Sequence, residues 1–227
     1  MSSVIHYACD VGSTRNSDFG WARSGGRDVR GGTSIDALVL SIQGDLASGT
    51  AALTIGMECP LFLPVPDDSD SLSTGRVGDK DRSCFAPAGG YVATLGLHQL
   101  AFLLRKLKRP GVSATVDWSA WSPQPSVVLF WEAFVSGPAH CAKSDKNAHV
   151  RDAATAATVM DESLSAARSA GNPVRVATGT SPLSLAGLAL IWSGWSDDLR
   201  LLSQDVLVVK PEKPFVGTIH PAEGVGL

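Results

Sequence analysis

The chain has 227 residues, of which 44% are hydrophobic and 18% charged, and a formal net charge of −3 at pH 7. This length suits one large domain or two small ones and is ample for a hydrophobic core. The composition excludes intrinsic disorder, which combines few apolar residues with a large net charge, and its scattered Gly and Pro exclude a collagen-like chain. The charge balance also argues against a polycation that attracts nucleic acid over its whole surface.

The N-terminus, the cysteines and the uncharged segments of the sequence bear on where the protein is located in the cell. The N-terminus lacks a basic segment followed by a long apolar one, so we expect no signal peptide. The four cysteines, none within metal-ligand spacing of another, are Cys9, Cys59, Cys84 and Cys141. Residues 83–104 and 176–196 lack charges, but their apolar runs are shorter than the ~20 residues of a membrane span. We therefore expect a cytoplasmic protein with reduced thiols and no membrane contact.

Hydrophobic patterns in the first part of the chain predict a strand, a hairpin, a helix and a further strand. In chain order these are strands at residues 4–11, 19–23 and 27–31, a helix from the N-cap Ser34 to about residue 48, and a strand at 51–57. Pro60, Pro64 and Pro66 exclude a helix after the last strand. Residues 67–73 are predicted to be a surface loop, and the segment from there to Pro87 is expected to be mobile.

The second part alternates helices with strands. In chain order we expect a helix at 90–108, a strand at 126–135, a polar loop at 136–147, an Ala-rich helix at 149–170, a helix that Ser181 and Pro182 open and that runs to about Trp195, and a final strand or tail at 205–210. This order predicts an α/β fold with a mixed sheet, an opening antiparallel hairpin and helices on both faces. Because no long linker divides the chain, residues 1–227 are expected to form a single domain with a C-terminal helix and strand extension.

Four acids suggest a site. Asp10, Glu58 and Glu132 interrupt apolar strand patterns, where a carboxylate is costly unless it is paired, hydrogen-bonded or metal-bound. Asp10 and Glu58 end their strands, at the edge where α/β sheets bind ligands, and on parallel neighbours ~4.8 Å apart they could share a cation. Asp152 begins the Ala-rich helix, whose small side chains let it lie close to the sheet. Carboxylates are the ligands that Mg²⁺ and Mn²⁺ prefer.

Each acid also has a purely structural interpretation. Asp10 before Gly12 fits a turn, Glu58 fits a loop cap, and Asp152 fits the favourable first turn of a helix. Taken alone, each acid is as consistent with structure as with function. Their occurrence together, on three predicted strands and one helix, favours a functional site.

These features resemble the ribonuclease H-like superfamily, which has an acid in the first strand, another in a later parallel strand and a third on a late helix. Residues 55–64, Ile-Gly-Met-Glu-Cys-Pro-Leu-Phe-Leu-Pro, resemble the I-D-x-P-x-G-L-P stretch of a family of uncharacterised predicted nucleases with that fold. Glu132 and the run Asp152-Ala153-Ala154 are similar to two further acidic segments of that family. The resemblance covers about residues 4–165; Glu58 replaces the commoner Asp, and nothing after residue 174 matches.

The resemblance implies a nuclease that hydrolyses phosphodiester bonds with two Mg²⁺ or Mn²⁺ ions ~3.5–4 Å apart. Asp10 would bridge the ions, Glu58 and Asp152 would hold one each, and Glu132 would be a ligand or the hydrogen-bond partner of one. The residues implied to position water or phosphate are Lys143, His140 and His149. Since the net charge is not basic, we expect a small or structurally restricted nucleic acid or nucleotide substrate.

Two alternatives stay open. The chain could be a non-catalytic binding or scaffold module on the same fold. Residues 10–14, Asp-Val-Gly-Ser-Thr, also resemble the first phosphate loop of sugar kinases and actin-like ATPases, although such proteins need two domains and this chain is long enough for one.

The tryptophans have two interpretations as well. Trp118, Trp121 and Trp131 could stack on bases, but packing in the core is the preferred interpretation. Trp192 and Trp195, three residues apart on a predicted apolar helix, indicate either core packing or the surface of a homodimer.

Overall fold

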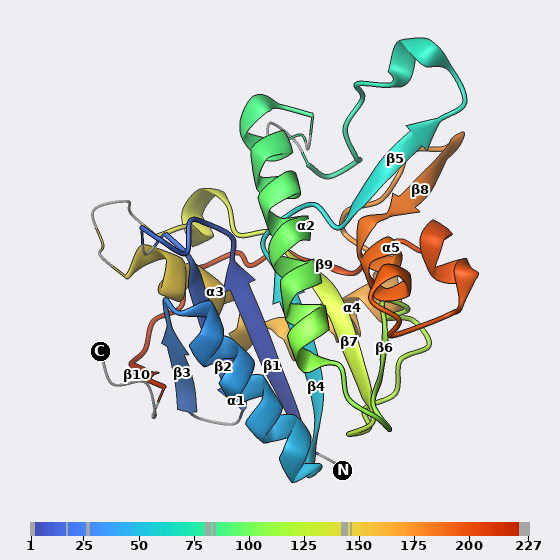
Figure 1. Cartoon of the computed structure of the whole chain (residues 1–227). Coiled ribbons are helices and arrows are strands. Elements are labelled where there is room, and N and C mark those ends of the chain that lie inside the picture. Colours follow the sequence, from blue (N-terminus) through green and yellow to red (C-terminus); the bar gives the residue numbers. More distant parts are fainter. Residues whose placement is uncertain are drawn as a thin grey trace.

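The computed structural model describes residues 3–16, 18–25, 28–79, 83, 85–141, 145 and 147–222. Within these residues, eight strands form one mixed sheet: β1 (Ser3–Asp10), β2 (Gly20–Gly25), β3 (Asp28–Gly32), β4 (Ala51–Met57), β6 (Ser113–Thr115), β7 (Val127–Ala133), β9 (Val208–Val209) and β10 (Ile219–Pro221). Their order is β10-β3-β2-β1-β4-β7-β6, and β9 pairs with β7 beyond this path (Figure 1). The expected α/β fold with a mixed sheet is therefore confirmed.

Strand directions follow from the connections. Strands β1, β2 and β3 are successively antiparallel, as short turns allow, which confirms the expected opening hairpin. Strands β1, β4 and β7 are parallel neighbours, and such pairs need long crossovers. The helix α1 (Ile35–Ser48) supplies the first crossover, and Ser34 caps it by accepting a hydrogen bond from Ala37 N. The carboxyl ends of β1, β4 and β7 thus lie along one edge of the sheet.

Helices cover both faces of the sheet (Figure 1). On one face α1 and α2 (Pro87–Leu107) bury side chains such as Leu38 and Leu100 against Tyr7 and Phe130. On the other face α3 (Ala148–Thr158) and α4 (Met160–Ala170) pack on Trp131. The two hydrophobic clusters explain why the central strands are buried on both sides and read as nearly continuous apolar runs.

The first turn of α3 lies unusually close to the sheet. A Cβ on Gly20 would come within 2.5 Å of the carbonyl oxygen of His149, and a Cβ on Gly31 within 2.8 Å of the Val150 side chain. The rest of the helix presents alanines to the strands, all buried: Ala153, Ala154, Ala156 and Ala157. Glycines on the sheet and alanines on α3 remove the side chains that normally hold a helix away from a sheet, as the sequence predicts for this helix.

The helix expected from Ser181 begins later. Ser181 and Pro182 belong to β8 (Thr180–Ser184), which pairs with β5 (Phe62–Pro66) in a separate antiparallel ribbon beside α5 (Figure 1). Pro182 stands opposite Pro64, a placement that an edge strand tolerates. The helix α5 (Leu185–Trp192) starts only after Ser184, whose hydroxyl accepts a hydrogen bond from Gly187 N at 3.0 Å.

The long Ala-rich helix is interrupted. Val159, at φ −104° and ψ 6°, separates α3 from α4. Just before the break, Thr155 and Thr158 donate their hydroxyls to the carbonyls of Arg151 and Ala154, and such bonds bend helices. The described residues also form three short 3₁₀ helices: η1 (Ser69–Ser71), η2 (Gly137–Ala139) and η3 (Leu199–Ser203).

The tryptophans serve the core. Trp118, Trp121 and Trp131 are 8%, 5% and 0% exposed, so core packing is confirmed and base stacking by these rings is wrong. Trp195 is also buried, whereas Trp192 is 62% exposed.

Among the residues that the structure describes, no helix combines the length and the apolar composition that crossing a bilayer requires.

Replacing Gly20 with Ala is expected to destabilise the fold by about 1–3 kcal/mol, since the new methyl group has no room against the first turn of α3. Gly44→Ala is the matched control, because Gly44 lies on α1 with nothing within 4 Å of its Cβ position. That change should stabilise the helix by about 0.5–1 kcal/mol. Urea unfolding of both variants measures the difference, and equal stabilities would contradict the close approach.

Candidate functional site

Asp10 and Glu58 stand at equivalent positions on neighbouring strands. Cys9 of β1 is paired with Met57 of β4 in parallel register, and each acid follows directly. The backbone N–H of Glu58 donates to the carbonyl of Cys9 at 2.7 Å, so the pairing continues to the strand ends. The expectation that these strands are parallel neighbours is confirmed, and their backbones are therefore about 4.8 Å apart.

A pocket of about 320 Å³ opens at this edge of the sheet, and Asp10, Glu58 and Glu132 contribute to its lining. The opposite wall is the start of α2, including Ala88 and Gly89. The carboxyl edge of an α/β sheet is where such folds bind ligands. We call this cavity the strand-end pocket. It combines an acidic floor with mainly apolar walls.

Asp10 is paired with His149 of α3. Nδ1 of His149 lies 2.7 Å from Oδ2 of Asp10, and Asp10 is only 8% exposed. Burial raises the pKa of Asp10, which the hydrogen bond and charge of His149 counteract and the charge of Asp152 reinforces. The hydrogen bond to Asp10 raises the pKa of His149 in turn, against the effect of partial burial. The pair therefore favours a protonated, positively charged imidazole beside the pocket.

A second carboxylate–imidazole pair lies behind the first. Asp152 is fully buried, its Oδ1 accepts a hydrogen bond from Cys141 N at 2.8 Å, and its Oδ2 lies 2.5 Å from Nδ1 of His140. Asp152 thus ties residues 140–141 to the first turns of α3. The structure brings Asp152 near enough to Asp10 for their charges to interact, but engages it with His140.

Glu132 points to the other face of the sheet. Glu132 pairs with Met57, which in turn pairs with Cys9, so these three side chains face the same side of the sheet. Asp10 follows Cys9 directly, and successive strand residues face opposite sides. The two carboxylate oxygens of Glu132 accept hydrogen bonds from Nη1 and Nη2 of Arg76, each at 2.7 Å, and Oε2 also accepts from Leu61 N at 2.9 Å. Its side chain is therefore committed to an ion pair.

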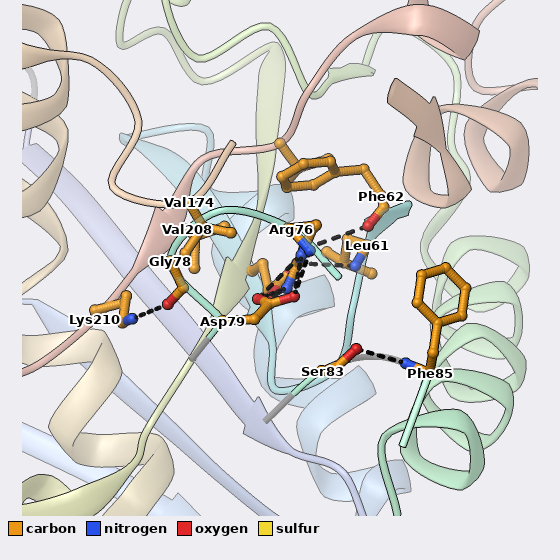
Figure 2. Close-up of polar contacts among 12 residues, drawn as sticks. Leu61, Phe62, Arg76, Gly78, Asp79, Ser83, Phe85, Val174, Val208 and Lys210 are labelled. Atoms are coloured by element: carbon orange, nitrogen blue, oxygen red, sulfur yellow. Dashed lines mark hydrogen bonds and ion pairs between the residues drawn. The ribbon is translucent and has the colours of Figure 1, made fainter. Parts of the chain in front are cut away.

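Arg76 is the centre of a buried charge network (Figure 2). Besides Glu132 it contacts Asp79, with Nη2 donating to Oδ1 at 2.9 Å, and Nη1 donates to the carbonyl of Phe62 at 3.3 Å. Arg76, Asp79 and Glu132 are 4%, 2% and 1% exposed. Burial disfavours the charged guanidinium, but the charges and hydrogen bonds of Glu132 and Asp79 outweigh it and raise the pKa of Arg76.

The same network fixes a segment that the sequence suggested was mobile. Val77 exchanges two backbone hydrogen bonds with Arg175, and Lys210 Nζ donates to the carbonyl of Gly78 at 2.6 Å (Figure 2). Residues 75–79 are therefore anchored across the end of β7, and the expectation of mobility is wrong for them. The sequence offered no periodicity here, and the only signal was an Arg and an Asp three residues apart.

The structure brings together several of the residues proposed from the sequence. Asp10, Glu58 and Glu132 line one pocket. Asp10 contacts His149, and Asp152 contacts His140. Lys143 lies outside the described residues. Within the described ranges, no group of three or more His, Cys, Asp or Glu side chains is arranged to hold a metal ion.

Comparison of the chain with family models, with curated proteins and with solved structures gives no match.

Removing Arg76 should be severely destabilising, because it leaves Glu132 and Asp79 as buried, uncompensated charges. We expect Arg76→Ala to lower the free energy of unfolding by about 3–5 kcal/mol in urea unfolding. Arg200→Ala, which removes an equivalent but exposed pair with Asp198, should leave stability unchanged. Equal effects of the two changes would show that the buried network does not stabilise this edge.

The His149 imidazole should titrate above its ordinary pKa of 6.5, and Asp10→Asn should lower that pKa towards the ordinary value. Because the folded-state pKa is the higher one, the stability that this pair contributes is complete below pH 6.5 and is lost as the pH rises through the raised pKa. NMR titration of the imidazole resonances measures both. His6, whose pKa burial lowers, is the internal control, and an unchanged His149 pKa in the variant would refute the coupling.

Proposed function

We propose that the strand-end pocket is the site of a divalent-cation-dependent hydrolase of phosphodiester bonds. The observation that carries the proposal is the pair of carboxylates, Asp10 and Glu58, at the ends of adjacent parallel strands and in the lining of one pocket. Oxygen-rich donor sets at such an edge suit Mg²⁺ and Mn²⁺ and the phosphate esters on which these ions act.

The topology supports the same proposal. The chain opens with a strand, an antiparallel hairpin, a helix and a parallel strand, with acids at the ends of the first and fourth strands. This is the arrangement on which the resemblance to the ribonuclease H-like superfamily rests. We therefore propose a ribonuclease H-like fold for the sheet and for α1 and α3, with β5, β8 and α5 as additions.

The donor set fits a cation held partly by its substrate. Mg²⁺ usually keeps several waters and takes one or two carboxylates together with phosphate oxygens, rather than a complete cage of protein ligands. Asp10 and Glu58 would supply two carboxylates of such a set. A bound cation of this kind lowers the pKa of water and offsets charge that develops on phosphate oxygens.

The protein's own groups orient the reactants. His149 fixes the rotamer of Asp10 through the 2.7 Å contact, so that the second carboxylate oxygen has a defined direction. The His149 side chain is 40% exposed, and its hydrogen bond to Asp10 raises the pKa of the ring above the ordinary value. When protonated, the ring can donate a proton to the oxygen that leaves when a phosphodiester bond breaks.

Two of the residues implied by the resemblance take different parts in this proposal. Glu132 positions the segment 75–79 through Arg76 instead of holding a cation. Asp152 orients His140 and the loop before α3, with its carboxylate against Cys141 N. The proposed centre is thus smaller than a four-acid site.

The carboxylate–imidazole pairs favour a second candidate. Asp10 and Asp152 each contact a histidine ring, His149 and His140, and carboxylates that already have protein partners suit a non-catalytic binding module on the same fold. A direct measurement of cation binding separates the two.

Titration calorimetry with Mn²⁺ should detect binding to the native protein and at least about tenfold weaker binding to Asp10→Asn and Glu58→Gln, since each removes one ligand charge. Bis(p-nitrophenyl) phosphate, a small phosphodiester, should be hydrolysed by the native protein with Mn²⁺ and not by either variant. Asp198→Asn, which changes an exposed acid outside the pocket, is the matched control. Absence of Mn²⁺ binding to the native protein would refute the proposed hydrolase and favour the binding module.

A further inference from the structure

A second cavity lies at the same edge of the sheet, beyond the first turn of α3. Its volume is about 540 Å³, and it lies between the end of β3, the strand β10 and the start of α3. We call it the Arg151 groove. The residues that give it its chemistry are Gly31, Gly32, Thr33, Asn147, Arg151 and Thr218. Nothing in the proposed hydrolytic centre uses any of these residues.

We infer that the Arg151 groove binds the sugar–phosphate backbone of a nucleic acid strand whose scissile phosphate lies in the strand-end pocket. The inference rests on the proposed function and extends it, because it makes the substrate an oligonucleotide and not a free nucleotide. It assigns Arg151 to a phosphate some nucleotides away from the bond that is cleaved.

The lining has the donors that such a backbone requires. The Arg151 side chain is 38% exposed, and its Nε donates to Asp145 at 2.9 Å. A guanidinium has five N–H donors, and arginine–phosphate contacts use them in pairs. Thr33, Thr218 and Asn147, which carry hydroxyl and amide groups, are exposed residues in the same lining. Such side chains make most of the contacts that proteins form with phosphate and sugar oxygens.

The two walls of the groove differ in polarity. Gly31 and Gly32 end β3 where its carboxyl edge meets the groove, and the exposed Thr33 follows them. On the other wall, Ile219 and Pro221 of β10 offer an apolar surface. A polar, glycine-lined wall facing an apolar one suits a ligand that carries both charged and apolar parts, as a nucleotide unit does.

The position of the groove links it to the proposed centre. Strand β3 runs in the same direction as β1, since each is antiparallel to β2, so Gly32 and Asp10 lie at the same edge of the sheet. The first turn of α3 contacts both ends of this edge: His149 reaches Asp10, and Arg151, two residues on, lines the groove. Strands β1 and β3 lie two strand spacings of ~4.8 Å apart, and a nucleic acid strand rises about 3.4 Å per nucleotide. A strand that spans both cavities therefore covers about three nucleotides.

The charge of the groove favours a tethered ligand over a free one. Asp145 partly neutralises Arg151, so one isolated phosphate gains little by binding there. A strand already held in the strand-end pocket presents its next phosphates at an effective concentration in the millimolar range, which converts a weak contact into measurable affinity. This also agrees with the overall charge of −3, which disfavours binding along a long duplex.

The test measures binding by fluorescence anisotropy with end-labelled phosphorothioate oligothymidylates of two and twelve nucleotides, whose linkages resist hydrolysis, in the presence of Mn²⁺. Arg151→Ala should weaken binding of the 12-mer about five- to tenfold and reduce the slope of log affinity against log salt by about one. Binding of the 2-mer should be unchanged. Arg151→Lys, which keeps the charge, should recover part of the loss.

Arg200→Ala is the matched control, because it also removes an arginine paired with an aspartate, through Asp198, but outside both cavities. It should bind both oligonucleotides like the native protein. Circular dichroism of Arg151→Ala confirms that a loss of binding is not a loss of fold. Equal affinities of native protein and Arg151→Ala for the 12-mer, or no binding of the 12-mer by the native protein, would overturn the inference.

Hydrolysis of bis(p-nitrophenyl) phosphate with Mn²⁺ distinguishes the two proposals, because this substrate is too small to reach the groove. If its hydrolysis depends on Asp10 and Arg151→Ala binds the 12-mer normally, the proposed function stands and the groove does not. If there is no hydrolysis but Arg151→Ala selectively loses the 12-mer, the groove stands as a nucleic acid site and the hydrolase is wrong. Equal loss of the 2-mer and the 12-mer would identify a site for small phosphates and overturn the inference.

Discussion

The close packing of the first turn of α3 on the sheet edge is the constraint on which the Asp10–His149 pair and the Arg151 groove depend. Gly20 and Gly31 remove the side chains that would hold the helix away, and the alanines of α3 continue the contact along the sheet. As a result, residues only two apart reach different places: His149 reaches the end of β1, and Arg151 reaches the end of β3. A helix held at an ordinary distance would separate these groups from the strand ends.

Charge at this edge is compensated in three different ways. Asp10 has a partly exposed histidine, Asp152 has a histidine and a backbone N–H, and Glu132 shares one guanidinium with Asp79. Burying an uncompensated carboxylate costs several kcal/mol, so each partner stabilises the fold whatever the site does. The three solutions differ in exposure: the side chains of His149 and His140 are 40% and 33% exposed, whereas Arg76 is buried together with Glu132 and Asp79.

The sequence predicted the elements whose hydrophobic period is long and clear, including β1, α1, β4 and β7, and the shared edge of Asp10 and Glu58 follows from their parallel order. It did not predict the partner of Glu132, because Arg76 lies 56 residues away in a segment without a period. A buried position shows only that the charge of an acid needs a partner. An arginine from a loop neutralises that charge as well as a metal cation does, so the pattern does not distinguish the two. The start of α5 was misplaced because Ser181-Pro182 satisfies the rules of a helix start and also those of an edge strand. Strands of three residues, such as β6 and β10, are too short to leave a pattern.

The position of β10 has a consequence for biosynthesis. Strand β3 is completed within the first 32 residues, but its outer edge is covered only when Ile219–Pro221 pairs with it. While the chain is being synthesised, that edge therefore presents unpaired N–H and C=O groups during the translation of nearly two hundred residues. At about 5–20 residues per second, the exposure lasts on the order of ten seconds or more. Open strand edges are templates for pairing with other chains, and a short edge strand with exposed charges, as β3 is with Asp28 and Arg30, limits such pairing before the last strand arrives.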